Sequence, residues 1–162
     1  MSEVSFRYIG TIHSPYSTVA EMPIQPRGAQ GIAGRVEVFS EFAEGLKDLS
    51  GFSHIYLVYH FHAATAMQLS VVPFLDTQEH GVFATRAPSR PNPLGLSVVR
   101  LREVRGNILL VENLDVLDGT PLLDIKPYLP AFDHWDVEST GWLSQKGLMA
   151  EAMRSDERFT RK

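Results

Sequence analysis

The sequence predicts a mainly β fold: a single closed or nearly closed β-barrel with short helices and a C-terminal helix. Apolar and polar residues alternate along several short segments, and this period of two is typical of strands with one buried face. Gly and Pro residues separate the segments about every 8–12 residues, and long helical segments seldom alternate with them, which argues against a parallel α/β sheet. Glycine-rich dinucleotide- and phosphate-binding motifs are also absent from the sequence.

The first elements are a strand, a loop, a second strand and a short helix. Val4–His13 is rich in strand-forming residues, and a Pro- and Gly-rich loop follows over Ser14–Gly34. Gly34–Phe39 alternates as a strand does. Ser40 is placed to cap a short helix over Glu41–Leu49.

The central segment His54–His62 gives the clearest strand pattern. Its alternation assigns Ile55, Leu57, Tyr59 and Phe61 to one face, and His54, Tyr56, Val58, His60 and His62 to the other. Further strands are predicted at Leu69–Val72, Gly81–Arg86, Gly95–Leu101 and Ile108–Glu112.

The last segment has the composition of a helix. Thr140–Arg158 contains mainly Leu, Met, Ala, Glu, Lys and Arg, which places Trp142, Met149 and Met153 on one helical face. No repeat or linker divides the chain. We therefore expect one domain, with the barrel over residues 1–136 and a helical tail of the same domain over residues 137–162.

Composition excludes several classes of site. The 162 residues include no cysteine, which removes disulfides, thiolate zinc sites and Cys nucleophiles and fits a reducing cytoplasm. No apolar run is long enough for a membrane helix, and the polar start is unlike a signal peptide. We therefore expect a cytoplasmic protein that has no membrane association.

Charge is unevenly distributed within a net formal charge of −4. Gly81–Leu110 contains five arginines and one acid, whereas Val111–Glu138 contains seven acids and one lysine. Two interpretations stay open: the two segments pair across a sheet, or a cationic loop faces an anionic or polar ligand.

The Pro-rich loop within Gly81–Ser97 is the strongest candidate site. Three prolines within six residues fix its backbone, namely Pro88, Pro91 and Pro93. A stiff loop holds Arg86, Arg90 and Asn92 in a set geometry, and arginine offers a planar fork of donors to carboxylate or phosphate. The alternative is a rigid turn with solvated arginines.

The segment Asp115–Pro130 is a second candidate, a proline-stiffened and non-repetitive path that contains an Asp118-Gly119 turn signal. Its polar groups suit ligand hydroxyls or amines, although solvated turn carboxylates are the commoner outcome.

The irregular loop Glu21–Gly28 is a weaker candidate. His60 and His62 lie on one strand face at a spacing that allows metal ligation, but the sequence offers no obvious further ligand, so no metal site is predicted.

Several motifs together resemble the TrmO/TsaA-like family. They are Ser14-Pro-Tyr, Gln25-Pro, Gly51-Phe-Ser-His54, Phe61-His62, GVFATR…RPNPLGLSVV from Gly81, and DGTPLLDIKPYLP from Asp118. Characterised members of the family are S-adenosylmethionine-dependent methyltransferases that modify N6-threonylcarbamoyladenosine beside the tRNA anticodon. The resemblance implies a single closed β-barrel, a homodimer with its cofactor site near the subunit boundary, S-adenosylmethionine as cofactor and tRNA as partner.

The resemblance also implies site residues. Cofactor contacts are expected at Ile24, Gln25, Pro26, Phe61, His62, Arg86, Leu96, Leu117, Asp118, Gly119 and Thr120. Catalytic roles are expected for Arg86, Arg90 and Asn92. Substrate contacts are expected at Arg90, Asp124, Lys126 and Tyr128.

Two departures from the family pattern concern the tRNA. Longer bacterial members carry a further C-terminal domain, whereas about 30 residues follow Pro130 here, and the chain lacks the basic charge usual for a tRNA binder. The alternatives are an S-adenosylmethionine-binding sensor without catalysis, a methyltransferase for a different small or RNA substrate, and a metal enzyme built on His60 and His62.

Overall fold

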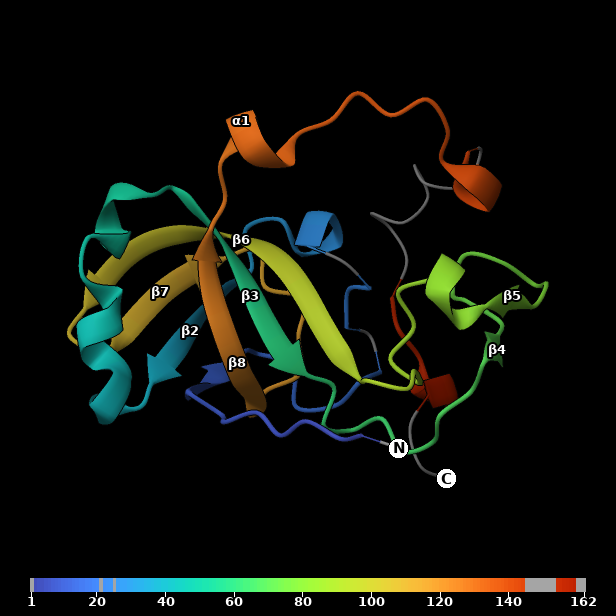
Figure 1. Cartoon of the computed structure of the whole chain (residues 1–162), viewed down its shortest axis with the longest axis horizontal. Coiled ribbons are helices and arrows are strands. Elements are labelled where there is room, and N and C mark those ends of the chain that lie inside the picture. The colour runs from blue at the N-terminus through green and yellow to red at the C-terminus, as the bar shows by residue number, and fades with distance from the viewer. Residues whose placement is uncertain (1, 21, 25, 145–153, 160–162) are drawn as a thin grey trace.

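The structure is a computed structural model that describes residues 2–20, 22–24, 26–144 and 154–159. Six antiparallel strands close a barrel in the order β1-β2-β7-β6-β3-β8 (Figure 1). In chain order these strands are β1 (Gly10–His13), β2 (Ala33–Val38), β3 (His54–His60), β6 (Leu94–Arg105), β7 (Ile108–Glu112) and β8 (Thr120–Pro127). The predicted closed barrel is confirmed.

The core of the barrel consists of the inward-facing residues of these strands. Along β3, Ile55, Leu57 and Tyr59 are buried and alternate with partly exposed residues, as the period of two predicts. Val36, Val99 and other apolar residues from the remaining strands fill the same interior. The barrel closes where β1 pairs with β8, with Gly10 opposite Leu122.

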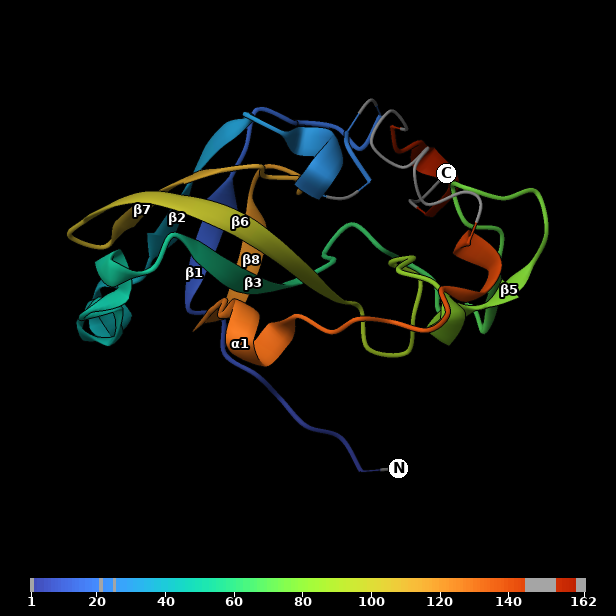
Figure 2. The ribbon, with the colours of Figure 1, turned by 90° about the horizontal axis from the view of Figure 1, so that it is seen from above.

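A small second sheet and short helical turns lie outside the barrel. Strands β4 (Ser70–Val71) and β5 (His80–Gly81) pair with each other at one end of the molecule (Figures 1 and 2). The helical elements are η1 (Pro26–Ala29), η2 (Ser40–Leu46), η3 (Leu49–Gly51), η4 (Val82–Ala84), α1 (Pro130–Asp133), η5 (Gly141–Leu143) and η7 (Glu157–Phe159).

Most of the predicted strands are confirmed, two are corrected, and one strand of the structure was not predicted. The first begins at Gly10, because Val4 and Phe6 point into solvent and have no face to bury. Within Gly81–Arg86 only the first residue belongs to a strand, and the 3-10 turn η4 follows. Strand β8 was not predicted, because the prolines of Asp115–Pro130 suggested a loop.

The predicted helix after Ser40 is a 3-10 helix, and its start carries no side-chain cap. Within the predicted C-terminal helix, residues 145–153 lie outside the described residues, and with them Met149 and Met153. The described parts on either side are the 3-10 turns η5 and η7 rather than an α-helix. Trp142 stacks on His80 with ring centroids 4.4 Å apart and donates its Nε1–H to the Ala84 carbonyl at 2.9 Å. This tail therefore packs against the small sheet.

Shortening a core side chain tests the tightness of the barrel. Ile55 is fully buried, so Ile55→Val is expected to lower the free energy of unfolding by ~0.5–1.5 kcal/mol. Urea unfolding measures the change. Val137→Ala, at a 68% exposed position, is the control and should change stability by less than ~0.5 kcal/mol. Equal effects of the two substitutions would contradict the placement of Ile55 in the core.

Candidate functional site

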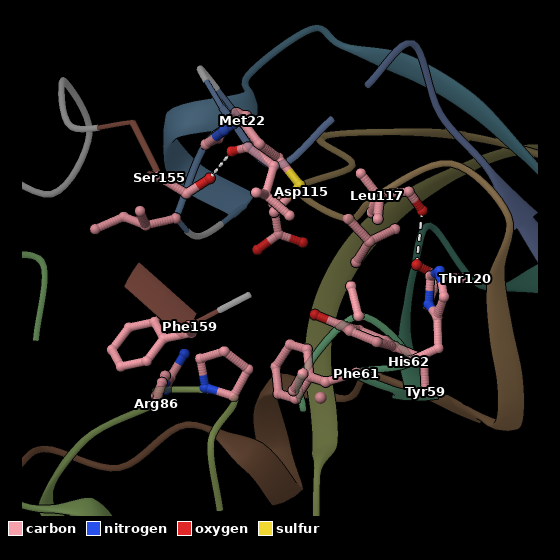
Figure 3. Close-up of a pocket in the computed structure, with 18 of the residues that line it drawn as sticks. Met22, Tyr59, Phe61, His62, Arg86, Asp115, Leu117, Thr120, Ser155 and Phe159 are labelled. Atoms are coloured by element: carbon pink, nitrogen blue, oxygen red, sulfur yellow. Dashed lines mark hydrogen bonds between the residues drawn. The ribbon is translucent and has the colours of Figure 1, made fainter. Parts of the chain in front are cut away.

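A cavity of about 350 Å³ opens at one end of the barrel, within the size range of small-molecule sites. Its walls come from the end of β3, the beginnings of β6 and β8, and the Pro-rich loop before β6. Residues 22–24 and the C-terminal residues Ser155, Asp156 and Phe159 complete the lining (Figure 3). Segments that are far apart in the sequence thus meet around one space.

The walls are largely apolar and aromatic. Tyr59 and Phe61 contact each other edge to face with ring centroids 5.5 Å apart. The Tyr59 ring is buried against β6 at Gly95, its partner in the β3–β6 register. A Cβ atom at Gly95 would lie 2.1 Å from Cε2 of that ring, so glycine is required for this close approach. Met22 and Leu117 add further apolar surface.

A buried polar chain forms one side of the cavity. The Ser97 hydroxyl donates to Oδ1 of Asp115 at 2.6 Å, and the Tyr59 hydroxyl lies 3.0 Å from Ser97 Oγ. Because Ser97 has a single hydroxyl proton, Tyr59 is the donor to Ser97 when Asp115 is ionised. Asp115 is only 7% exposed, yet it lines the cavity, and Figure 3 shows its carboxylate pointing into the enclosed space.

Burial dominates the electrostatics of this chain. It raises the pKa of Asp115 to about 6, against the lowering effects of the Ser97 hydrogen bond, the Asp115 backbone and the Arg86 charge. Burial and the nearby Asp115 also raise the pKa of Tyr59. His62 lines the opposite wall, and burial lowers its pKa. At neutral pH the cavity therefore holds a buried carboxylate together with a neutral tyrosine and a neutral histidine.

Two arginines from the Pro-rich loop supply positive charge. Arg86 is exposed at the cavity and acts electrostatically on both Asp115 and Tyr59. Arg90 also lines the cavity, but its Nη1 donates to the carbonyls of Thr85 and Ala87, each at 3.1 Å. Arg90 thus fixes the backbone that carries Arg86.

The structure shows cross-strand pairing for part of the charge pattern, whereas two arginines of the Pro-rich loop are not paired in this way. Arg102 of β6 pairs with Glu112 of β7 at 2.9 Å, which is the expected cross-strand pairing. Arg86 and Arg90 line the cavity instead.

The C-terminal residues cover the cavity through contacts with distant segments. The Ser155 amide donates to the Met22 carbonyl at 2.6 Å, and its hydroxyl donates to the Val19 carbonyl. Phe159 contacts the Phe74 ring edge to face at 5.4 Å. Sequence patterns do not predict this arrangement, because the two Ser155 contacts join residues more than 100 positions apart and no local motif marks them.

The cavity brings together much of the site that was predicted. Seven of the residues expected to contact the cofactor line it, namely Ile24, Phe61, His62, Arg86, Leu96, Leu117 and Thr120. Gln25 lies outside the described residues, and Pro26 begins η1. Lining residues that were not predicted as contacts include Tyr59 and Asp115, which are joined through Ser97.

The turn Leu117–Thr120 supports the cavity in two ways. The Thr120 hydroxyl donates to the Leu117 carbonyl at 2.6 Å, which holds the two lining residues together. Asp118 accepts the Ser14 amide at 3.1 Å and lies 3.3 Å from Nδ1 of His13, while the Gly119 amide donates to the Ile12 carbonyl. Gly119 has φ of +77°, a conformation that favours glycine.

The other predicted residues lie outside the cavity. Asn92 is exposed in the Pro-rich loop. Asp124 and Lys126 pair at 2.8 Å on β8, and Tyr128 contacts the Tyr56 ring at 5.5 Å. Because a strand rises ~3.3 Å per residue, Tyr128 lies about 26 Å along the chain path from Thr120. These three residues follow β8 away from the cavity of their own chain.

His60 and His62 have different surroundings, and only His62 lines the cavity. His60 accepts or donates a hydrogen bond through Nδ1 to the Tyr8 hydroxyl at 2.7 Å and stacks on that ring, whereas His62 lines the cavity. In the part of the chain that the structure describes, no group of three or more His, Cys, Asp or Glu residues is arranged to hold a metal ion. The described helices are also too short or too polar to span a bilayer.

Comparisons with known proteins agree with this architecture. The family profile of the tRNA-methyltransferase O N-terminal domain matches residues 11–134. A probable S-adenosyl-L-methionine-binding protein of Pyrococcus abyssi is 54% identical over 156 residues, which cover 96% of this chain and 85% of that protein. The tRNA (adenine(37)-N6)-methyltransferase of Escherichia coli is 38% identical over 140 residues, which cover 80% of this chain and 60% of the enzyme.

A solved structure has the same fold. The crystal structure of TrmO from Pseudomonas aeruginosa superposes with a TM-score of 0.73 at 37% identity, covering 87% of this chain and 63% of that one. The chain therefore spans less than two thirds of this solved structure and of the E. coli enzyme, but most of the P. abyssi protein. With the profile matched over most of its length and the barrel shared with a solved member, the chain belongs to the TrmO family of tRNA-methyltransferase O N-terminal domains.

Proposed function

We propose that this protein is an S-adenosylmethionine-dependent methyltransferase that methylates N6 of threonylcarbamoyladenosine at position 37 of tRNA, acting as a cytoplasmic homodimer. The observation that carries the proposal is the cavity itself, which gathers seven expected cofactor contacts from separate segments into one space. The E. coli relative bears the name of a tRNA (adenine(37)-N6)-methyltransferase, and the P. abyssi relative that of a probable S-adenosylmethionine-binding protein.

The chemistry of the lining suits the proposed cofactor. S-adenosylmethionine combines a flat purine, a positively charged sulfonium and an amino acid end with an amino group and a carboxylate. Aromatic and aliphatic walls at Phe61 and Leu117 offer surface for the purine. The Arg86 guanidinium suits the carboxylate, and the buried Asp115 suits a positive group. The residues present therefore fit the group.

The proposed reaction depends more on alignment of the nucleophile, the methyl group and the sulfur than on general acid–base catalysis. When bound, the cofactor supplies a methyl group on a positively charged sulfur. A nucleophile in line with the carbon–sulfur bond takes the methyl group and displaces the sulfur. The carbamoyl-bearing N6 of the substrate is a weak nucleophile, because its lone pair is delocalised. We expect Arg86 or Arg90, which both line the cavity, to stabilise negative charge on the carbamoyl side chain as N6 loses its proton, and an arginine fork also suits the threonyl carboxylate.

The first test is calorimetric titration of cofactor-stripped protein with S-adenosylmethionine. Binding on the order of micromolar, near one ligand per chain, is expected. Arg86→Ala is expected to weaken it about tenfold through loss of a charge-assisted pair. Arg102→Ala is the matched control, because Arg102 pairs with Glu112 on the barrel wall and should leave the affinity unchanged. Absence of binding both with and without added tRNA would contradict the proposal.

The second test is methyl transfer to tRNA from cells that lack the modification. Transfer by the wild-type protein and its loss in Arg86→Ala are expected. A binding-only function is the alternative, since the P. abyssi relative is named only for S-adenosylmethionine binding. Tight binding without transfer to any tRNA preparation would favour that sensor function over the methyltransferase.

A further inference from the structure

Asp115 carries a buried negative charge whose contacts within the protein are mainly neutral. Its hydrogen-bond donors are the Ser97 hydroxyl and the Asp115 backbone amide, and Arg86 acts on it at longer range through its charge. Among the described residues, no lysine, arginine or histidine forms an ion pair with it. The carboxylate nevertheless points into the cavity. A desolvated carboxylate is costly unless a positive group comes to it, and the open side of Asp115 faces the space available to a ligand.

The surroundings of Asp115 favour one type of positive group. An ammonium has three N–H donors and needs several acceptors, whereas a sulfonium has no N–H and is weakly hydrated. Aromatic side chains beside a carboxylate are suited to weakly hydrated onium cations, as in the recognition of quaternary ammonium groups. The neighbouring Tyr59 and Phe61 rings provide that surface in the cavity.

We propose that the Asp115 carboxylate, together with the Tyr59 and Phe61 rings, selects the sulfonium form of the cofactor over the neutral thioether that remains after transfer. This inference rests on the proposed function. During transfer, the electron pair of the methyl–sulfur bond stays on sulfur, the new methyl–nitrogen bond forms, and the proton of the acceptor nitrogen passes to water. The ligand thus loses its sulfonium charge in the cavity, and Asp115 loses its counter-charge.

The consequence is expected in binding rather than in the chemical step. The attraction to Asp115 weakens as the sulfur becomes neutral, so it stabilises the bound reactant more than the transition state. Asp115 is therefore expected to favour binding of the sulfonium cofactor and release of the neutral product. An opposite charge within about 4–6 Å typically shifts a carboxyl pKa by 1–3 units, and each unit corresponds to a tenfold change in affinity.

Titration of wild type and Asp115→Asn with S-adenosylmethionine and with S-adenosylhomocysteine tests the selection. Asparagine keeps the shape and removes the charge. We expect the variant to bind S-adenosylmethionine at least about tenfold more weakly and to bind S-adenosylhomocysteine within about threefold of wild type. Asp136→Asn removes one negative charge from an exposed acid that does not line the cavity and is the matched control: its ratio of the two affinities should stay near that of wild type. Thermal unfolding verifies that each variant is folded.

The other outcomes separate the two hypotheses. Equal weakening of both ligands in Asp115→Asn would overturn the selection, because it would place the carboxylate on the amino group that the two ligands share. If wild type binds neither ligand, the proposed function itself fails. Retention of S-adenosylmethionine affinity in Asp115→Asn would overturn the inference and leave the proposed function intact.

The pH dependence provides an independent measure. Among the described residues, the charged and titratable groups that line the cavity with Asp115 are Tyr59, His62, Arg86, Arg90 and Asp156. Protonation of Asp115 near pH 6 should weaken S-adenosylmethionine binding in wild type as pH falls from 7.5 to 5, relative to Asp115→Asn. His62 and the other groups remain in both proteins, so the difference between them isolates Asp115. A difference that does not change with pH would contradict the assignment.

Discussion

Replacement of Gly95 by alanine is expected to destabilise the protein and to disrupt the cavity together. The added Cβ would lie 2.1 Å from Cε2 and 2.4 Å from Cζ of Tyr59, far closer than real Cβ contacts. The ring has little freedom to move, because it is buried, packs against Phe61 and hydrogen bonds to Ser97. We expect Gly95→Ala to lower the free energy of unfolding by ~2–4 kcal/mol in urea unfolding and cofactor affinity by more than about tenfold.

Two further variants assign the effect to this contact. Gly51→Ala is the matched control, since an added Cβ there meets no atom within 4 Å, and both stability and affinity should stay near wild type. Adding Tyr59→Leu to Gly95→Ala removes the ring atoms that clash and should recover part of the lost stability. If Gly95→Ala behaves as Gly51→Ala does, the close approach of ring and backbone is incorrect.

The barrel was predictable from sequence where a strand has one buried face. The strict alternation of β3, with Ile55, Leu57 and Tyr59 inside, is a direct consequence of the pleat. Strand β8 escaped prediction because prolines usually mark loops. Pro121 and Pro127 lie at the second and the last positions of the strand, so the ladder tolerates them.

The site was predictable only in part, for a different reason. Motif resemblance identified lining residues such as Phe61, Arg86 and Thr120. Alternation could assign Tyr59 to a buried face. It does not show that Tyr59, Ser97 and Asp115 form one hydrogen-bonded chain, because the three residues come from different segments. The contact between Ser155 and residues near Met22 is similarly non-local. Local patterns predict faces of elements, whereas the cavity depends on how the faces assemble.

Asp115→Asn is expected to stabilise the protein at neutral pH while it impairs ligand selection. The pKa of Asp115 is about 6 in the folded protein and 3.8 for the ordinary side chain. Between these values the folded state binds more protons than the unfolded state, so this group makes stability fall as pH rises. Above pH 6 the penalty approaches about 3 kcal/mol, as an upper estimate for a shift of this size. Asparagine does not titrate, so urea unfolding should show the variant ~1–3 kcal/mol more stable at pH 7.5.

The pH profile of the difference is the decisive measurement. Well below pH 3.8 the aspartate is protonated in both states, so the advantage of Asp115→Asn should fall away as pH drops toward 3 and return as pH rises from 4 to 6. Asp136→Asn, at an exposed acid, controls for the loss of one negative charge and should stay within ~0.5 kcal/mol of wild type at each pH. An advantage of the same size at pH 4 and pH 7.5 would mean that packing, and not the buried charge, separates the two proteins. An advantage confined to neutral pH would mean that the fold keeps a destabilising carboxylate in its cavity, as expected for a group retained for binding.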